Sequence, residues 1–223
     1  MRQLEQDTAT VVIERASIAG ATLELDIAVR NLTGHKFPTG YPSRRAWIHV
    51  TVRDREGRVL FESGRVTDTG LVQGNDSDAV SSSFEPHYTE ITTADQVQTY
   101  ESVMGTPAGA PTTGLLQATQ YLKDNRLLPR GFEKATAASE IGVYGDAAVD
   151  PDFIGGGDGV RYRVAAAAAA TVEVELRYQP IGYRWAQNLA SYKAVEPRNF
   201  VEYYNALAAA SSVVVARATS PVR

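Results

Sequence analysis

The chain has 223 residues with 43% hydrophobic and 22% charged side chains, a formal net charge of −4, and no cysteine. This size and composition suit one folded domain with a single principal core rather than a disordered chain. No basic stretch interleaved with aromatic residues is present, which excludes a nucleic-acid surface. The lack of cysteine excludes disulfides, thiolate zinc sites, iron–sulfur clusters and covalent attachment of c-type haem within this chain.

The N-terminal residues and the hydropathy bear on where the protein works. No apolar run approaches the roughly 20 residues needed to cross a bilayer, so we expect no membrane span. Residues 1–6 (MRQLEQ) lack the apolar core of a signal peptide. We therefore expect either a cytoplasmic protein or an exported one whose leader or larger N-terminal region is absent from this chain.

The first third of the chain predicts strands. Residues 21–31 alternate apolar and polar side chains with the period of a half-buried strand. Residues 44–54 alternate in the same way, and residues 58–62 follow after a turn that places Gly57 where a positive φ is expected. These two segments predict a β-hairpin.

Residues 64–159 are rich in Gly, Pro, Ser, Thr and Asp, which predicts an irregular insertion with long loops. Within it, residues 96–104 and 115–124 each suit either a strand or a helix. Residues 171–178 predict another strong strand, with residues 160–164 as its expected partner. The alanine run at residues 165–170 has helical propensity but no amphipathic pattern, so we interpret it as a connection.

The last part of the chain predicts a helix. Pro197 suits a first helical turn, and apolar residues then recur at helical spacing, so we expect a helix over residues 197–217. The order of elements lacks the alternation of a parallel α/β sheet. The predicted fold is therefore mainly β, an antiparallel β-sandwich formed by residues 1–223 as one domain, with long loop insertions and a C-terminal helix.

The loop at residues 31–45 carries the most specific chemistry. Two glycines, two prolines and several short polar residues predict a tightly shaped turn around His35. A neutral imidazole can ligate a metal or carry a proton near neutral pH. His35 is therefore a candidate axial ligand to a haem iron, and the alternative is that its ring nitrogens satisfy backbone groups of the loop.

The other candidate residues give weaker patterns. His49 and His87 match no compact metal-ligand spacing with His35, and we expect His49 on a strand face and His87 at a loop end or a partner contact. Asp76 and Asp78 lie in an oxygen-rich segment that resembles a calcium loop, although the full EF-hand pattern and its distal Glu are missing, which favours an ordinary Asx-rich turn.

No motif predicts catalysis. The chain has no cysteine nucleophile and no GxSxG elbow, and Asp150 and Asp152 lie in turn-like sequence beside a proline. The glycines at residues 155–159 lack the Gly-Lys-Ser/Thr of a phosphate loop. Several aromatic residues, Trp185 among them, suit either a sugar-stacking platform or ordinary packing. We expect the protein not to be an enzyme.

Five segments together resemble the β-rich C-terminal region of certain multihaem c-type cytochromes. The most specific is residues 34–47 (GHKFPTGYPSRRAW), followed by FESG at 61–64. The others are FEPHY at 84–88, DQVQTYE at 95–101, YLKDNRLLP at 121–129 and YQPIGYRWA at 178–186.

In such cytochromes this region follows haem-binding CxxCH segments and itself carries no haem. The resemblance implies a periplasmic or extracellular electron-transfer setting and a haem-bearing cytochrome polypeptide as partner. It implies that His35 is the distal ligand to the iron of a haem c held by that partner, with His87 as a second candidate for haem contact. Every CxxCH is missing here, so electron transfer by this chain alone is not expected.

The leading hypothesis is therefore a noncatalytic accessory domain that packs on a multihaem cytochrome. The alternative is a secreted glycan- or calcium-binding β-sandwich module.

Overall fold

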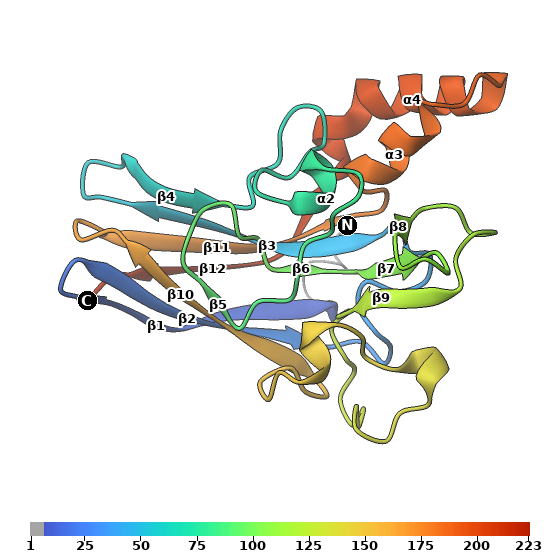
Figure 1. The fold of residues 1–223 in the computed structure, drawn as a ribbon. Helices are drawn as coiled ribbons and strands as arrows, with labels where there is room; N and C mark the ends of the chain where they lie inside the picture. The colour runs from blue at the N-terminus through green and yellow to red at the C-terminus, as the bar shows by residue number, and fades with distance from the viewer. Residues whose placement is uncertain (1–6) are drawn as a thin grey trace.

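Two β-sheets face each other across a shared apolar core in the computed structural model, which describes residues 7–223 (Figure 1). Residues 1–6, on which the expectation about a leader depends, lie outside the described residues. The fold is mainly β with several antiparallel sheets, as predicted from the alternating patterns.

The larger strands are β1 (Ala9–Ala19), β2 (Thr22–Asn31), β3 (Arg45–Arg53), β4 (Val59–Ser63), β10 (Gly157–Ala165), β11 (Thr171–Gln179) and β12 (Val213–Pro221). The shorter ones are β5 (Glu90–Ile91), β6 (Thr99–Tyr100), β7 (Ser102–Gly105), β8 (Pro111–Thr112) and β9 (Gln120–Asp124). The helices are α2 (Asp76–Ala79), α3 (Tyr183–Leu189) and α4 (Val195–Leu207), with 3-10 turns η1 (Ser139–Ile141), η2 (Asp146–Ala148) and η3 (Ala208–Ser211).

One sheet has the strand order β1-β2-β10-β5 and the other has the order β12-β11-β3-β4, with β6 also paired to β3. A third, small sheet has the order β8-β7-β9 and lies at one end of the sandwich (Figure 1). The long pairings are antiparallel, and the short pairing of β10 with β5 is parallel. The segment that follows β12 also reaches the first strand, because the backbone of Arg223 bonds to Ala16 and Ile18 of β1.

The strands with clear alternation form where the sequence predicts them. Residues 22–31 form β2, residues 171–179 form β11, and the hairpin forms as β3 and β4. Gly57 in the hairpin turn has a φ of +82°, a conformation that only glycine adopts without strain.

The predicted pairing of residues 160–164 with residues 171–178 is wrong. Strand β10 pairs with β2, whereas β11 pairs with β3 and β12. The alanine run between them is a connection, as expected, but it carries the chain from one sheet to the other instead of forming a hairpin. Alternation specifies which face of each strand is buried, and it does not specify which strand lies beside it.

The middle of the chain contains short elements between long loops, as the composition predicts. Both ambiguous segments form strands: residues 96–104 contain β6 and part of β7, and residues 115–124 end in β9. Near the C-terminus the predicted helix forms as α4, but it ends at Leu207, about ten residues earlier than expected. Val213, Val214 and Val215 begin β12, because β-branched residues favour an extended strand beside β11.

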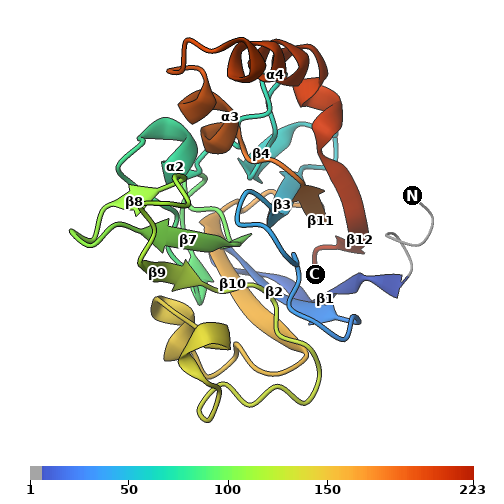
Figure 2. The ribbon, with the colours of Figure 1, turned by 90° about the vertical axis from the view of Figure 1, so that its right-hand side faces the viewer.

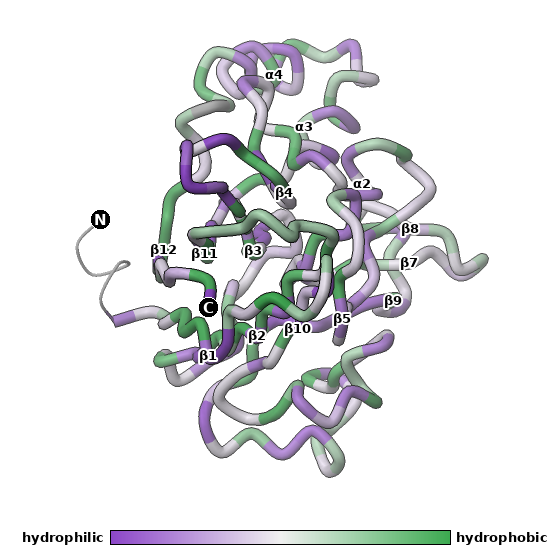
Figure 3. Tube along the Cα trace, turned by 90° about the vertical axis from the view of Figure 1, so that its left-hand side faces the viewer, coloured by the Kyte–Doolittle hydropathy of each residue, from purple (hydrophilic) through white to green (hydrophobic). Residues whose placement is uncertain are grey.

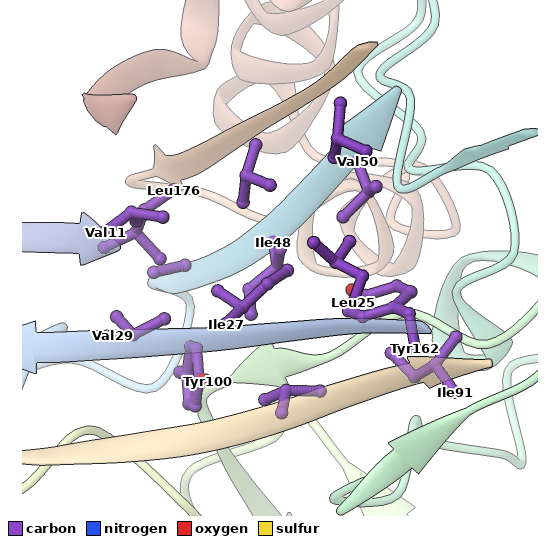
Figure 4. Packing of buried hydrophobic residues seen from close by; sticks show 14 of the residues in the cluster. Val11, Leu25, Ile27, Val29, Ile48, Val50, Ile91, Tyr100, Tyr162 and Leu176 are labelled. Atoms are coloured by element: carbon purple, nitrogen blue, oxygen red, sulfur yellow. The ribbon is translucent and has the colours of Figure 1, made fainter. Parts of the chain in front are cut away.

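The core lies between the two large sheets (Figure 4). Leu25, Ile27 and Val29 of β2 point toward Ile48 and Val50 of β3, and all five are buried. Along the chain, apolar and polar residues alternate on the strands of both sheets (Figure 3). Burial of these aliphatic side chains supplies the main stabilising free energy of the sandwich.

The connection between β2 and β3, which carries His35, lies at the same end of the sandwich as the small sheet and α3 (Figure 2). Regular strands thus support a cluster of loops at this end, the arrangement in which loops most often carry function.

Candidate functional site

Asn31, the last residue of β2, organises the loop that carries His35. Its buried side-chain amide donates to the carbonyl oxygens of His35 (2.8 Å) and Leu127 (2.9 Å). Its Oδ1 accepts hydrogen bonds from the backbone N–H and the hydroxyl of Thr33. One buried side chain thereby fixes both the turn and its contact with the segment after β9.

Lys36 holds the other side of the loop. Its Nζ donates to Oδ2 of Asp124 (2.8 Å) and to the carbonyl of Gly142 (2.7 Å). Burial lowers the pKa of Lys36, while the charge of Asp124 and its hydrogen bond oppose that effect. The ammonium group is therefore tied to the interior, and the neighbouring His35 remains at the surface.

The His35 side chain is exposed, and two contacts of Nδ1 define its ring orientation. The hydroxyl oxygen of Thr33 lies 3.3 Å from Nδ1. Nδ1 lies 3.0 Å from the carbonyl oxygen of Lys36. A carbonyl can only accept, so Nδ1 carries the proton and donates it. In a neutral ring this leaves the lone pair on Nε2, which bonds to no other described residue.

This arrangement fits an axial ligand to a haem iron. Metal-binding histidines commonly donate the other ring N–H to a backbone carbonyl, and His35 already does so with Lys36. The chain has no thiol to attach a porphyrin, so a covalently bound haem c at this position would belong to another polypeptide. The sequence left two interpretations of His35 open, a haem ligand and a ring whose nitrogens bond to the loop. In the structure Nδ1 bonds to the loop, and Nε2 has no partner among the described residues.

His87, the second candidate, lies in the interior and belongs to a buried polar cluster formed by His87, Gln98, Tyr100, Asn125, Asp150 and Asp158. Its side chain is 1% exposed, and Nε2 lies 3.0 Å from Oδ2 of Asp150. Nδ1 lies 2.8 Å from Nε2 of Gln98 and 3.0 Å from Nδ2 of Asn125. Neither ring nitrogen is open to a partner molecule.

Backbone groups orient the two amides beside His87. Oε1 of Gln98 accepts from the N–H of Tyr88, and Oδ1 of Asn125 accepts from the N–H of Glu101. Both amides therefore present N–H groups to Nδ1, which must accept. The neutral His87 ring consequently carries its proton on Nε2 and donates it to Asp150.

This tautomer decides whether the cluster suits a metal. His87, Asp150 and Asp158 offer ligand atoms that all lie within 4.8 Å of one another. A metal on Nε2 would require the proton to move to Nδ1, which faces two N–H donors. The donor set therefore fits a fixed neutral imidazole and does not fit a metal ligand.

Asp76 and Asp78, the candidate calcium ligands, do not converge. Asp78 is buried, and its carboxylate accepts two hydrogen bonds from Arg45 and one from the N–H of Val72. Asp76 is exposed at the start of the short helix α2. The segment provides a buried ion pair instead of a set of free oxygens.

The three histidines have different neighbours. His49 lies on β3, with Nε2 3.0 Å from Glu62 and Nδ1 3.3 Å from Glu175. It thus occupies a strand face, as expected, and has no contact in common with His35 or His87.

An uncharged groove adjoins the His35 loop. Tyr41, near the end of the loop, packs edge-on against Trp185 of α3, with ring centroids 5.4 Å apart. Two connected hollows around this pair are lined without any Asp, Glu, Lys or Arg. Leu116 and Tyr192 line them too and are strongly exposed. Pairing of Trp185 with this loop was not predictable from spacing.

Comparison with known proteins supports a fold relationship alone. No protein-family model matches the chain, and no curated protein matches it significantly. Among solved structures, the chain is similar to a penta-heme cytochrome c552 from Thermochromatium tepidum, with 15% sequence identity and a TM-score of 0.57. The alignment covers 99% of this chain and 40% of the cytochrome chain, so this chain spans less than half of that protein. The fold is therefore related to part of a multihaem cytochrome.

Among the described residues, no helix is long and apolar enough to cross a membrane.

Proposed function

We propose that this chain is a noncatalytic accessory domain of a multihaem cytochrome assembly, which packs on haem-bearing polypeptide and supplies His35 as a distal axial ligand. The observation that carries the proposal is the exposed His35 ring, whose Nδ1 donates to the Lys36 carbonyl and whose Nε2 lone pair is free. The fold shared with part of a penta-heme cytochrome supports the choice of partner.

The uncharged groove provides the contact surface for that partner in this proposal. Tyr41 belongs to the same loop as His35 and lines the groove with Trp185, Tyr192 and Leu116. Tyrosine and tryptophan are enriched, and charged residues depleted, at the centres of protein interfaces. An uncharged, partly apolar segment of the haem-bearing polypeptide is the complementary occupant. Because c-type cytochromes are assembled outside the cytoplasm, we place the domain in the periplasm or outside the cell.

A haem peptide with one histidine ligand and an open sixth position tests the His35 role without an identified partner. Titration with the intact chain should convert the absorption spectrum to that of a low-spin, bis-histidine haem. His35→Ala should abolish the change. His49→Ala is the matched control, since His49 is held between two carboxylates, and it should behave as the wild type. An equal response from His35→Ala, or no response from the wild type, would contradict the ligand role.

A further inference from the structure

The buried polar cluster around His87 contains two carboxylates and no cation. The side chains of Asp150 and Asp158 are 1% and 0% exposed. The two amides that face Nδ1 of His87 leave this nitrogen an accepting role only, because a proton on Nδ1 would point at N–H donors. Two negative charges in this site would therefore face each other without compensation, which is costly at such burial.

The hydrogen bonds distinguish the two acids. Asp150 is satisfied as a carboxylate, because Oδ2 accepts from Nε2–H of His87 and Oδ1 accepts from the N–H of Asp152. Asp158 is satisfied on one side only. Its Oδ2 accepts from the hydroxyl of Tyr100 (2.7 Å) and the amide of Gln98 (3.0 Å). Its Oδ1 is buried and has no partner among the described residues.

We propose that Asp158 is a proton-binding site of the folded protein, which takes up one proton on Oδ1 and so removes the second negative charge of the cluster. Oδ2 already accepts two hydrogen bonds, which leaves Oδ1 as the place for the proton. Asp158 is also among the residues that line a surface hollow with Asp152 and Gly159, so its buried carboxyl lies close to the protein surface. The site is independent of whether His35 binds iron.

The groups around Asp158 support this assignment. Burial raises the pKa of Asp158 to about 6, and the charge of Asp150 raises it further, even when a positive charge on His87 and the hydrogen bonds from Tyr100 and Gln98 oppose the rise. The pKa of Asp150 is shifted the other way. Burial acts to raise this pKa, but the hydrogen bonds from His87 and from the N–H of Asp152 hold it below its ordinary value.

Charged and titratable groups face the cluster from each neighbouring element. Tyr100 approaches from β6 and His87 from the loop before β5, while Tyr162 of β10 has a buried hydroxyl without a partner among the described residues. Lys134 approaches from the loop between β9 and η1 and bonds to the backbone carbonyl of Asp150, not to either carboxylate. No ammonium or guanidinium group among the described residues therefore neutralises Asp158 directly.

The sign of the pH effect follows from the raised pKa. The unfolded chain releases this proton near pH 3.8 and the folded protein near pH 6, so the stabilising contribution is complete below pH 3.8. It declines as the pH rises to about 6, by about a hundredfold in the unfolding equilibrium constant. Above pH 6 the folded protein holds an uncompensated carboxylate in the link between β6, β10 and two loops.

Asp158→Asn tests the proposal, because the amide imitates the protonated acid in shape and charge. Glu85, whose pKa burial raises to about 7, adds its own pH dependence to both proteins. The variant should therefore lose the share of the change in unfolding equilibrium constant between pH 4 and pH 6 that comes from Asp158, and it should be more stable than the wild type at pH 7.5. Equal pH dependence in both proteins, measured by urea unfolding, would overturn the assignment. Asp150→Asn is the control for removing a buried carboxylate that stays ionised over this range.

Infrared spectroscopy gives a second readout on the wild type, which needs no variant that folds. A carbonyl band of a buried carboxylic acid should be present at pH 5 and lost by pH 7.5, with slow deuterium exchange. Burial also raises the pKa of Glu85, to about 7, so Glu85 contributes to the same spectral region. The Asp158→Asn protein should lose the Asp158 component of the signal, seen in the difference spectrum against the wild type, and Asp76→Asn, at an exposed position, should keep it. A wild-type protein without this band at pH 5 would overturn the proposal independently of any effect on stability.

Discussion

The carboxylate of Asp78 and the guanidinium of Arg45 form a buried, two-pronged ion pair, with both N–O distances at 2.8 Å. The pair joins α2 to the first residue of β3. Gln179 at the end of β11 completes it by accepting from Nε of Arg45. The segment that suggested calcium thus serves to fix the insertion to the sandwich.

Asp78→Asn should destabilise the protein strongly, because it leaves a buried guanidinium without its counter-charge. We expect a loss of about 3–5 kcal/mol in the free energy of unfolding. Urea unfolding at neutral pH measures it. Asp76→Asn, two residues earlier and exposed, should change stability by less than about 0.5 kcal/mol. Comparable effects of the two substitutions would show that the ion pair is not a fixed part of the fold.

Asn31 should act as a positioning residue for His35. Asn31→Ala removes two hydrogen bonds to carbonyls and two from Thr33, and we expect a loss of about 3 kcal/mol in stability. Binding of the haem peptide should weaken through a faster dissociation rate, because the ring no longer has a fixed orientation.

Thr33→Val is the milder companion, since it removes only the hydroxyl contacts of the same turn. It should weaken haem-peptide binding less than Asn31→Ala while leaving the protein folded. Unchanged binding in both variants would mean that the loop does not orient His35.

Glu175 should give the protein part of its resistance to acid. The hydrogen bond from His49 first, and then those from Arg217 and Arg177, lower its pKa from 4.5 to about 2 against the effect of burial. This contribution to stability is complete above pH 4.5 and is lost as the pH falls to about 2. Glu175→Gln should flatten the dependence of stability on pH in that window, measured by urea unfolding. Glu173→Gln, on the same strand but 39% exposed, should leave the dependence nearly unchanged.

Tryptophan fluorescence should report on the groove. Trp47 is fully buried and bonds to the carbonyl of Gly64, whereas Trp185 lines the groove beside Tyr41. If the groove binds polypeptide, neutral oligosaccharides should leave the emission of the wild type unchanged. A saturable change that disappears in Trp185→Phe would assign the groove to glycan binding, the alternative function of the chain.

The sequence predicted elements whose side chains alternate without interruption. Strands β2, β3 and β11 belong to this group, and so does the hairpin turn at Gly57. Strand β1 did not stand out, because its register shifts between Ile13 and Arg15 and breaks the alternation. The helix predicted over residues 197–217 includes the first five residues of β12, because the alanines before this strand extend the helical pattern of α4.

The candidate sites also differ in how much of them the sequence could predict. The His35 loop was predictable because its glycines, prolines and short polar residues are contiguous. The cluster of His87, Asp150 and Asp158 was not, because His87 and Asp150 are separated by 63 residues and meet only when two loops pack against β10. Trp185 and Tyr41 are likewise far apart in the sequence, and their rings pack together only in the folded protein.

The backbone bonds between Arg223 and the first strand have a consequence for biosynthesis. A ribosome delivers β12 after all the other described strands, yet β12 covers one edge of β11, and Arg223, two residues beyond β12, bonds to β1. Until that stretch has left the exit tunnel, both partners present unpaired edges that invite association with other chains. A nascent chain therefore exposes two strand edges for as long as β12 has not been made.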